Sequence, residues 1–154
     1  MERRSTFDLF KSEICHQAMD MYDISETGNM HDLGAVINES AKGSDFNLSF
    51  REFLDFFYSV KNKTELFELI KGEPKYYTCV PDYQYAMCAA TANKLANDYD
   101  IEVPDWVWND RYYLKQPFFG GIRKGRLRMY NMLYSPPEFK NRGLFLDENI
   151  LLRI

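Results

Sequence analysis

The sequence is poor in the residue types from which most catalytic and metal centres are built. It contains only 2 His and 3 Cys, and no cysteine lies at a spacing typical of a zinc finger. The glycine-rich basic stretch FFGGIRKGR lacks the spacing of a phosphate-binding loop before a Lys-Ser or Lys-Thr pair. Cys15 and His16 are adjacent, so on a helix they point to different faces and make a poor nucleophile and base. We therefore predict no enzymatic activity, no catalytic residue, no metal and no cofactor.

Paired cysteines, a secretory signal and long apolar runs are also missing. Cys15, Cys79 and Cys88 are odd in number and irregular in spacing, which favours a reducing compartment and small buried thiols. Residues 1–16 carry charges but lack the apolar core of a signal peptide. No apolar run approaches the length of a membrane span. We expect a cytoplasmic protein without membrane contact.

Valine-rich alternating segments, which are typical of β-strands, are nearly absent, whereas helical patterns are frequent. Hydrophobic residues make up 45% of the 154 residues and charged residues 27%, which suits one packed domain. The predicted fold class is mainly α: a compact multi-helix domain with an irregular aromatic-rich C-terminal region and few or no strands. Within this single domain, 1–154, we distinguish acidic helices over 1–72, a linker and central helix over 73–110, and a basic subregion over 111–154.

Apolar residues at helical spacing and capping signatures place the individual helices. The first expected helix follows Ser5, and the second lies between Met30 and Gly43. A third starts at Ser49, with Glu52 in a capping box, and a fourth starts at Asn62 and ends before Gly72. Two more occupy residues 82–98 and 126–134. Residues 82–98 carry apolar side chains on two faces, which predicts a helix buried in the middle of the domain.

The end of the chain is unusually apolar for a terminus. Ser135, followed by two prolines and a glutamate, predicts a helical turn that Gly143 ends. Residues 144–146 are expected to be extended, and Asp147 to cap a last short helix. Because apolar residues at such spacing usually pack, we predict that this tail closes the core.

Charge is distributed unevenly along the chain. The net charge is -4, but residues 111–154 contain nine basic and three acidic residues, so this part is +6 and residues 1–110 are -10. Such asymmetry indicates either a basic face for an acidic partner or two halves that attract each other.

Three motifs in the last third occur in a fixed order: PDW at 104–106, RYYLKQPF at 111–118, and SPPEFKNRGLFLDENILLR at 135–153. They resemble a group of small bacterial proteins in which PxW precedes RYxLxxPxF and SPxxFxxRxxFxxxxxLxR ends the chain. That group includes helix-turn-helix regulators and small proteins encoded beside nucleotidyltransferase-like toxins, for which an antitoxin role is the usual assumption. The resemblance covers roughly the last fifty residues. The front half departs from the regulators, because it has no basic recognition helix.

Residues 106–128 mix aromatic rings with arginines, a composition that serves protein interfaces and also single-stranded nucleic acid. Six residues are the predicted partner-binding set: Trp108, Tyr112, Arg123, Lys124, Arg126 and Arg128. Internal packing is expected instead for Trp106, Phe118, Phe119 and Phe139. A third interpretation is that Arg128 and Arg142 pair with carboxylates of the front half.

The resemblance implies an antitoxin-like protein that neutralises a cognate protein by direct contact, with a nucleotidyltransferase-like toxin as the partner. The alternative is a nucleic-acid-binding transcriptional regulator that uses residues 106–128.

Overall fold

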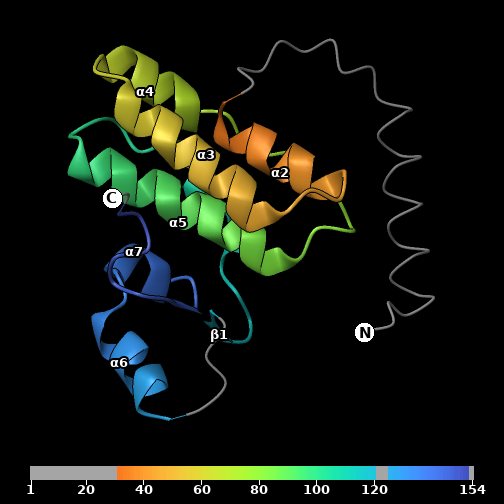
Figure 1. Cartoon of the computed structure of the whole chain (residues 1–154), viewed down its shortest axis with the longest axis vertical. Helices are drawn as coiled ribbons and strands as arrows, with labels where there is room; N and C mark the ends of the chain where they lie inside the picture. Colours follow the sequence, from red (N-terminus) through yellow and green to blue (C-terminus); the bar gives the residue numbers. More distant parts are fainter. Residues whose placement is uncertain (1–30, 121–124, 153–154) are drawn as a thin grey trace.

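The mainly α prediction is confirmed. The computed structural model describes residues 31–120 and 125–152; the helix expected after Ser5 lies outside them. The elements are α2 (Leu33–Ala41), α3 (Phe46–Ser59), α4 (Lys63–Ile70), α5 (Asp82–Asp98), the 3₁₀ turns η1 (Asp105–Trp108) and η2 (Asp110–Tyr112), β1 (Phe118–Phe119), α6 (Arg126–Tyr134), α7 (Pro137–Lys140) and β2 (Leu144–Phe145). Figure 1 shows α2, α3 and α4 on one side of α5, and α7 and α6 on the other.

Side-chain caps fix where the first helices begin. The carboxylate of Asp32 accepts from Ala35 N at 2.7 Å, and the amide oxygen of Asn62 accepts from Thr64 N at 3.0 Å. The predicted start at Asn62 is therefore confirmed. The predicted start at Ser49 is wrong, because Asp45 accepts from Asn47 N at 2.9 Å and begins α3 earlier.

α5 is the centre of the domain, as its two apolar faces predicted. Its bounds are those expected, and its alanines are almost all fully buried. α5 packs against α2 on one side and against α7, η1 and η2 on the other. Because alanine side chains are small, these neighbours can approach α5 closely. Through these contacts α5 lies between the acidic front half and the basic subregion.

A small parallel strand pair organises the basic subregion. Phe118 pairs with Leu144, and Phe119 pairs with Phe145. Parallel strands need a crossover connection, which here contains α6 and α7. Gly143 enters β2 with φ +79°, a conformation that favours glycine, so the predicted stop at this residue is confirmed.

Ser135 joins α6 to β2 instead of capping the next helix. Its Oγ accepts from Leu146 N at 2.8 Å and lies 2.6 Å from Leu146 O; it also contacts Asn131 O. Pro136 takes the N-cap position of α7 and makes no side-chain cap bond. The predicted Ser135 cap is wrong because its hydroxyl is turned toward the strand.

The tail closes the core, as predicted, through three leucines that are almost fully buried: Leu144, Leu146 and Leu151. The Tyr58 hydroxyl donates to Leu151 O at 2.7 Å and ties this end of the chain to α3. After Asp147 the chain forms a hydrogen-bonded turn and not the predicted last helix. Asp147 still acts locally, since its carboxylate accepts from Asn149 N at 2.8 Å.

The cysteines correct one prediction. Cys88 is free and buried, and burial raises the pKa of its thiol. Cys79 is half-buried and disulfide-bonded, so the prediction of a small buried thiol is wrong at this position. Cys15 lies outside the described residues. Among the helices that the structure describes, none is long and apolar enough to cross a membrane.

Candidate partner-binding surface

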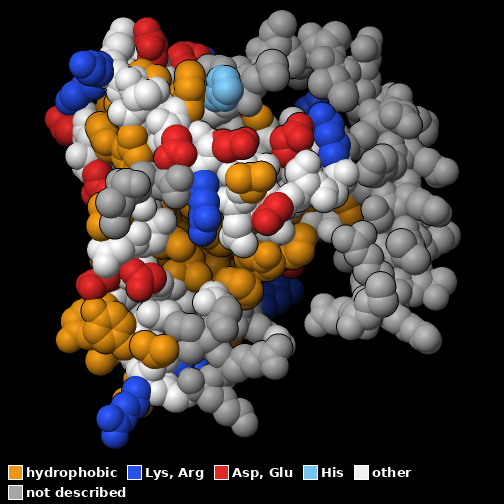
Figure 2. Space-filling view, in the orientation of Figure 1, with side chains coloured by type: hydrophobic (Ala, Val, Ile, Leu, Met, Phe, Trp, Pro, Cys, Tyr) orange, Lys and Arg blue, Asp and Glu red, His pale blue; other side chains and the backbone are white. Residues whose placement is uncertain are grey.

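All six apolar side chains of α6 face solvent. Leu127 and Leu133 are each 66% exposed, although leucines in a folded domain are usually buried. The exposed apolar set in this helix is Leu127, Met129, Tyr130, Met132, Leu133 and Tyr134. Asn131 is the one residue of α6 that is buried. Figure 2 shows hydrophobic side chains gathered at the lower left, where Figure 1 places α6.

A few contacts hold α6 in place. Lys140 Nζ donates to Leu133 O at 2.7 Å, and the Tyr130 hydroxyl donates to Glu148 Oε1 at 2.7 Å. The guanidinium of Arg128 lies 3.7 Å from the centre of the Phe119 ring, a cation–π contact with β1. These contacts hold α6 against the domain, while the rest of its surface is exposed to solvent.

The predicted binding residues divide into three groups. Trp108 is 53% exposed and Arg126 is exposed, as a binding role requires. Arg128 is half-buried, and its guanidinium lies over the Phe119 ring. Arg123 and Lys124 lie outside the described residues. Of the rings expected inside, Trp106 and Phe139 are buried, while Phe118 and Phe119 are half-buried.

Tyr112 is not part of the surface, and its predicted binding role is wrong. It is 0% exposed, because η2 turns its ring inward against α5 and the edge of Trp106, with the ring centres 5.4 Å apart. Its hydroxyl donates to Glu73 Oε1 at 2.6 Å. Burial first, and then the bond to Glu73, raises the pKa of Tyr112 well above its ordinary value of 10.0.

Tyr112 is therefore expected to make the protein sensitive to alkali. A pKa that is raised in the folded state means that the folded protein favours the neutral hydroxyl. The contribution of Tyr112 to the free energy of unfolding is therefore complete below about pH 10 and is lost as the pH rises above that value. Tyr112→Phe should lower the free energy of unfolding by about 1–2 kcal/mol at pH 7 and flatten its decline above pH 10. Urea unfolding between pH 7 and pH 11 measures both effects. An unchanged decline above pH 10 would contradict this role.

Arg142 has a structural role that the sequence pattern missed. Its side chain is 1% exposed; Nη1 donates to Glu138 O and Nη2 to Val107 O, each at 2.9 Å. The guanidinium also lies near the rings of Trp108 and Tyr113, with 5.6 and 5.1 Å to their centres. Burial lowers the pKa of Arg142. The predicted pairing with a front-half carboxylate is wrong, because backbone carbonyl groups accept from both Nη1 and Nη2.

An open groove of about 700 Å³ lies beside the 3₁₀ turns. Tyr76, Arg111 and Lys115 line it together with the carboxylates of Asp82 and Asp110. The Arg111 guanidinium lies 5.9 Å from the centre of the Tyr76 ring. Both signs of charge are present, so this groove offers no uniformly cationic track for a phosphate backbone. Local sequence patterns do not reveal this groove, because Tyr76 and Arg111 come from different segments.

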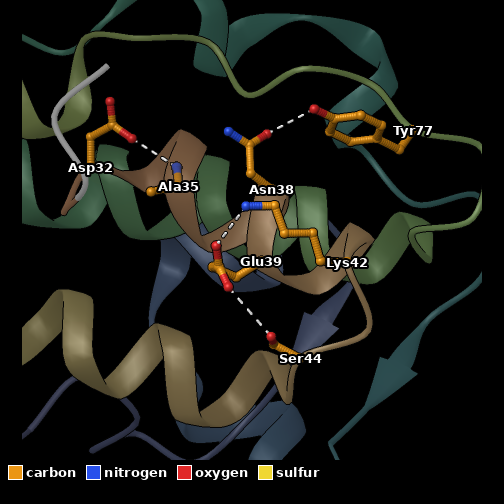
Figure 3. Close-up of polar contacts among 7 residues, drawn as sticks. All are labelled: Asp32, Ala35, Asn38, Glu39, Lys42, Ser44 and Tyr77. Atoms are coloured by element: carbon orange, nitrogen blue, oxygen red, sulfur yellow. Dashed lines mark hydrogen bonds and ion pairs between the residues drawn. The ribbon is translucent and has the colours of Figure 1, made fainter. Parts of the chain in front are cut away.

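The polar surface of α2 contrasts with the apolar surface of α6. Figure 3 shows the Tyr77 hydroxyl donating to Asn38 Oδ1 at 2.9 Å, which ties the α4–α5 connection to α2. Glu39 receives Lys42 Nζ at 3.2 Å and Ser44 Oγ at 3.4 Å. These exposed pairs satisfy one another locally and contribute little stability. At this end of α2, the charges of Glu39 and Lys42 are therefore engaged within the chain.

Within the described ranges, 31–120 and 125–152, no group of three or more His, Cys, Asp or Glu side chains is arranged to hold a metal ion. Comparison of the chain with protein-family models, with curated proteins and with solved structures finds no match.

Proposed function

We propose that this chain is a non-enzymatic, cytoplasmic, antitoxin-like protein that neutralises a cognate protein by direct contact. One observation supports it most: α6 holds six exposed apolar side chains on a helix fixed to the domain. A contiguous exposed apolar patch on a packed domain is typical of a protein interaction site. The motif pattern of the last fifty residues favours a nucleotidyltransferase-like toxin as the partner.

The alternative, nucleic-acid binding through residues 106–128, has less support. Its rings Trp106 and Tyr112 are buried and cannot stack on bases, and Tyr113, Phe118 and Phe119 are half-buried. Among the described rings of this stretch, Trp108 alone is more than half exposed. The sequence pI of about 5.2 and the acidic front half also oppose a phosphate backbone.

Co-expression with the protein encoded by the adjacent gene tests the proposal. We expect a complex that co-purifies, and we expect that expression of the chain relieves growth inhibition by that neighbour. Replacing Trp108 and Arg126 together with Ala should weaken the complex by at least about tenfold while the fold stays intact by circular dichroism. Glu52→Ala, an exposed change on α3, is the control.

Two results would contradict the proposal. The first is the absence of any complex with a neighbour-encoded protein. The second is tight binding of the isolated chain to labelled single-stranded DNA or RNA that weakens steeply with salt, which would favour the regulator instead.

A further inference from the structure

The proposed function leaves open which element meets the partner and what the partner presents. We infer that α6 inserts as a docking helix into an apolar groove of the partner protein, and that carboxylates line the end of the groove that receives Arg126. This inference rests on the proposed function and specifies its contact surface.

The geometry of α6 matches a helix that binds in a groove. Met129, Tyr130 and Leu133 lie at helical spacing on the outer face, with Arg126 at the N-terminal end of the same face. The Tyr130 and Tyr134 rings lie 4.5 Å apart and widen this face on one flank. Asn131, on the opposite side, is buried against the domain. The outer face therefore presents anchors to a concave surface.

Charge identifies the class of partner. No Asp or Glu occurs between Asp110 and Glu138, whereas Arg126 is exposed at the first position of α6 and the first turn contains no acid. The N-terminal end of a helix carries a partial positive charge, and Arg126 adds to it. Carboxylates on the partner would match both. Glu148 meets this face near the middle of the helix, where it already accepts from the Tyr130 hydroxyl.

A second copy of this chain fits this surface less well. Two α6 helices packed against each other would bring arginines together with no acid among the residues of either helix. Packing of α6 on the acidic front half of another copy would join two different surfaces. Such head-to-tail contacts form open filaments, unless the rotation between successive copies brings them into a closed ring. A separate partner with an acidic-rimmed groove avoids both problems.

Binding of the full chain to the neighbour-encoded protein, measured by calorimetry, tests the inference. Met129→Ser with Leu133→Ser should weaken binding by about 30-fold or more, since buried interface anchors carry most of the binding energy. Leu48→Ser on α3, where Leu48 is 57% exposed, is the matched control and should change affinity by less than about twofold. Both variants should keep the parent melting temperature, because exposed side chains are replaced.

Substitutions of Arg126 test whether carboxylates of the partner bind the N-terminal end of α6. Arg126→Glu should weaken binding more than Arg126→Ala, and Arg126→Lys should preserve most of it. Binding should also weaken as NaCl rises from about 0.05 to 0.5 M.

The outcomes separate the inference from the function. If the complex forms and the double serine variant binds like the parent, α6 is not the docking element, although the proposed function stands. If no complex forms, both fall. If the double variant instead abolishes self-association seen by sedimentation, or binding of the chain to anionic lipid vesicles, then a second copy or a membrane occupies α6 and the inference is overturned.

Discussion

Removal of residues 144–154 is expected to destabilise the protein more than any single exposed substitution. The deletion removes three buried leucines, the whole of β2 and the carbonyl that receives the Tyr58 hydroxyl. A buried leucine truncated to alanine costs about 2–5 kcal/mol, and the free energy of unfolding of a whole domain is about 5–15 kcal/mol. The truncated chain should therefore be largely unfolded at 25 °C, as judged by circular dichroism and urea titration.

Point variants keep this expectation testable if the truncated chain cannot be purified. Leu144→Ala should lower the free energy of unfolding by about 2–5 kcal/mol, since Leu144 is fully buried. Leu152→Ala should change it by less than about 0.5 kcal/mol, because Leu152 is 65% exposed. Equal effects of the two substitutions, or a truncated chain that melts like the parent, would show that the tail does not close the core.

Arg142→Met is the second substitution with a large expected effect. It removes the donors of two carbonyl groups, Val107 O and Glu138 O, within a tightly packed site. A hydrogen bond to a charged group contributes about 1.5–3 kcal/mol, and a buried carbonyl left without its donor costs about 1–3 kcal/mol. We expect a loss of about 3 kcal/mol in the free energy of unfolding and a shift in tryptophan fluorescence, because Trp108 loses the guanidinium beneath its ring.

Two further variants separate charge from geometry at this site. Arg142→Lys keeps the positive charge but lacks the planar fork that reaches two carbonyls, so it should recover less than half of the lost stability. Lys140→Met removes a cation that is less buried, whose Nζ contacts Leu133 O, and should cost less than about 1 kcal/mol. A Lys140 variant as unstable as the Arg142→Met variant would mean that positive charge in this region, and not the buried fork, is what matters.

Regular elements were the part of the fold that local sequence could predict. α5 and α6 have the bounds expected from their apolar spacing, since such spacing is a property of neighbouring residues. Helix starts were less certain where two capping residues compete. Ser49 and Asp45 both precede apolar residues, and Asp45 caps α3 because its carboxylate reaches Asn47 N.

The site was harder to predict because exposure depends on tertiary contacts. Tyr112 and Trp108 are both aromatic and lie close together in the sequence, yet one is buried and the other is half exposed. The turns of η1 and η2 decide this, and those turns depend on packing against α5. The apolar residues of α6 likewise gave no sign that they face solvent. The predicted cap at Ser135 fails because its hydroxyl binds the backbone of Leu146, 11 residues later and just after β2.

The placement of α6 inside the crossover between β1 and β2 has a consequence for how this protein could diversify. The two strands are paired, and Ser135 is bonded to Leu146. These contacts hold both ends of the crossover in place, and they do not involve the side chains on the outer face of α6. Exposed positions on such an element tolerate substitution with little change in stability. Mutations at Met129, Tyr130 or Leu133 could therefore accumulate and alter partner choice while the core around α5 stays the same. In relatives of this chain, we expect these outer positions to vary faster than Asn131, Ser135 and Gly143, in step with changes in the partner's groove.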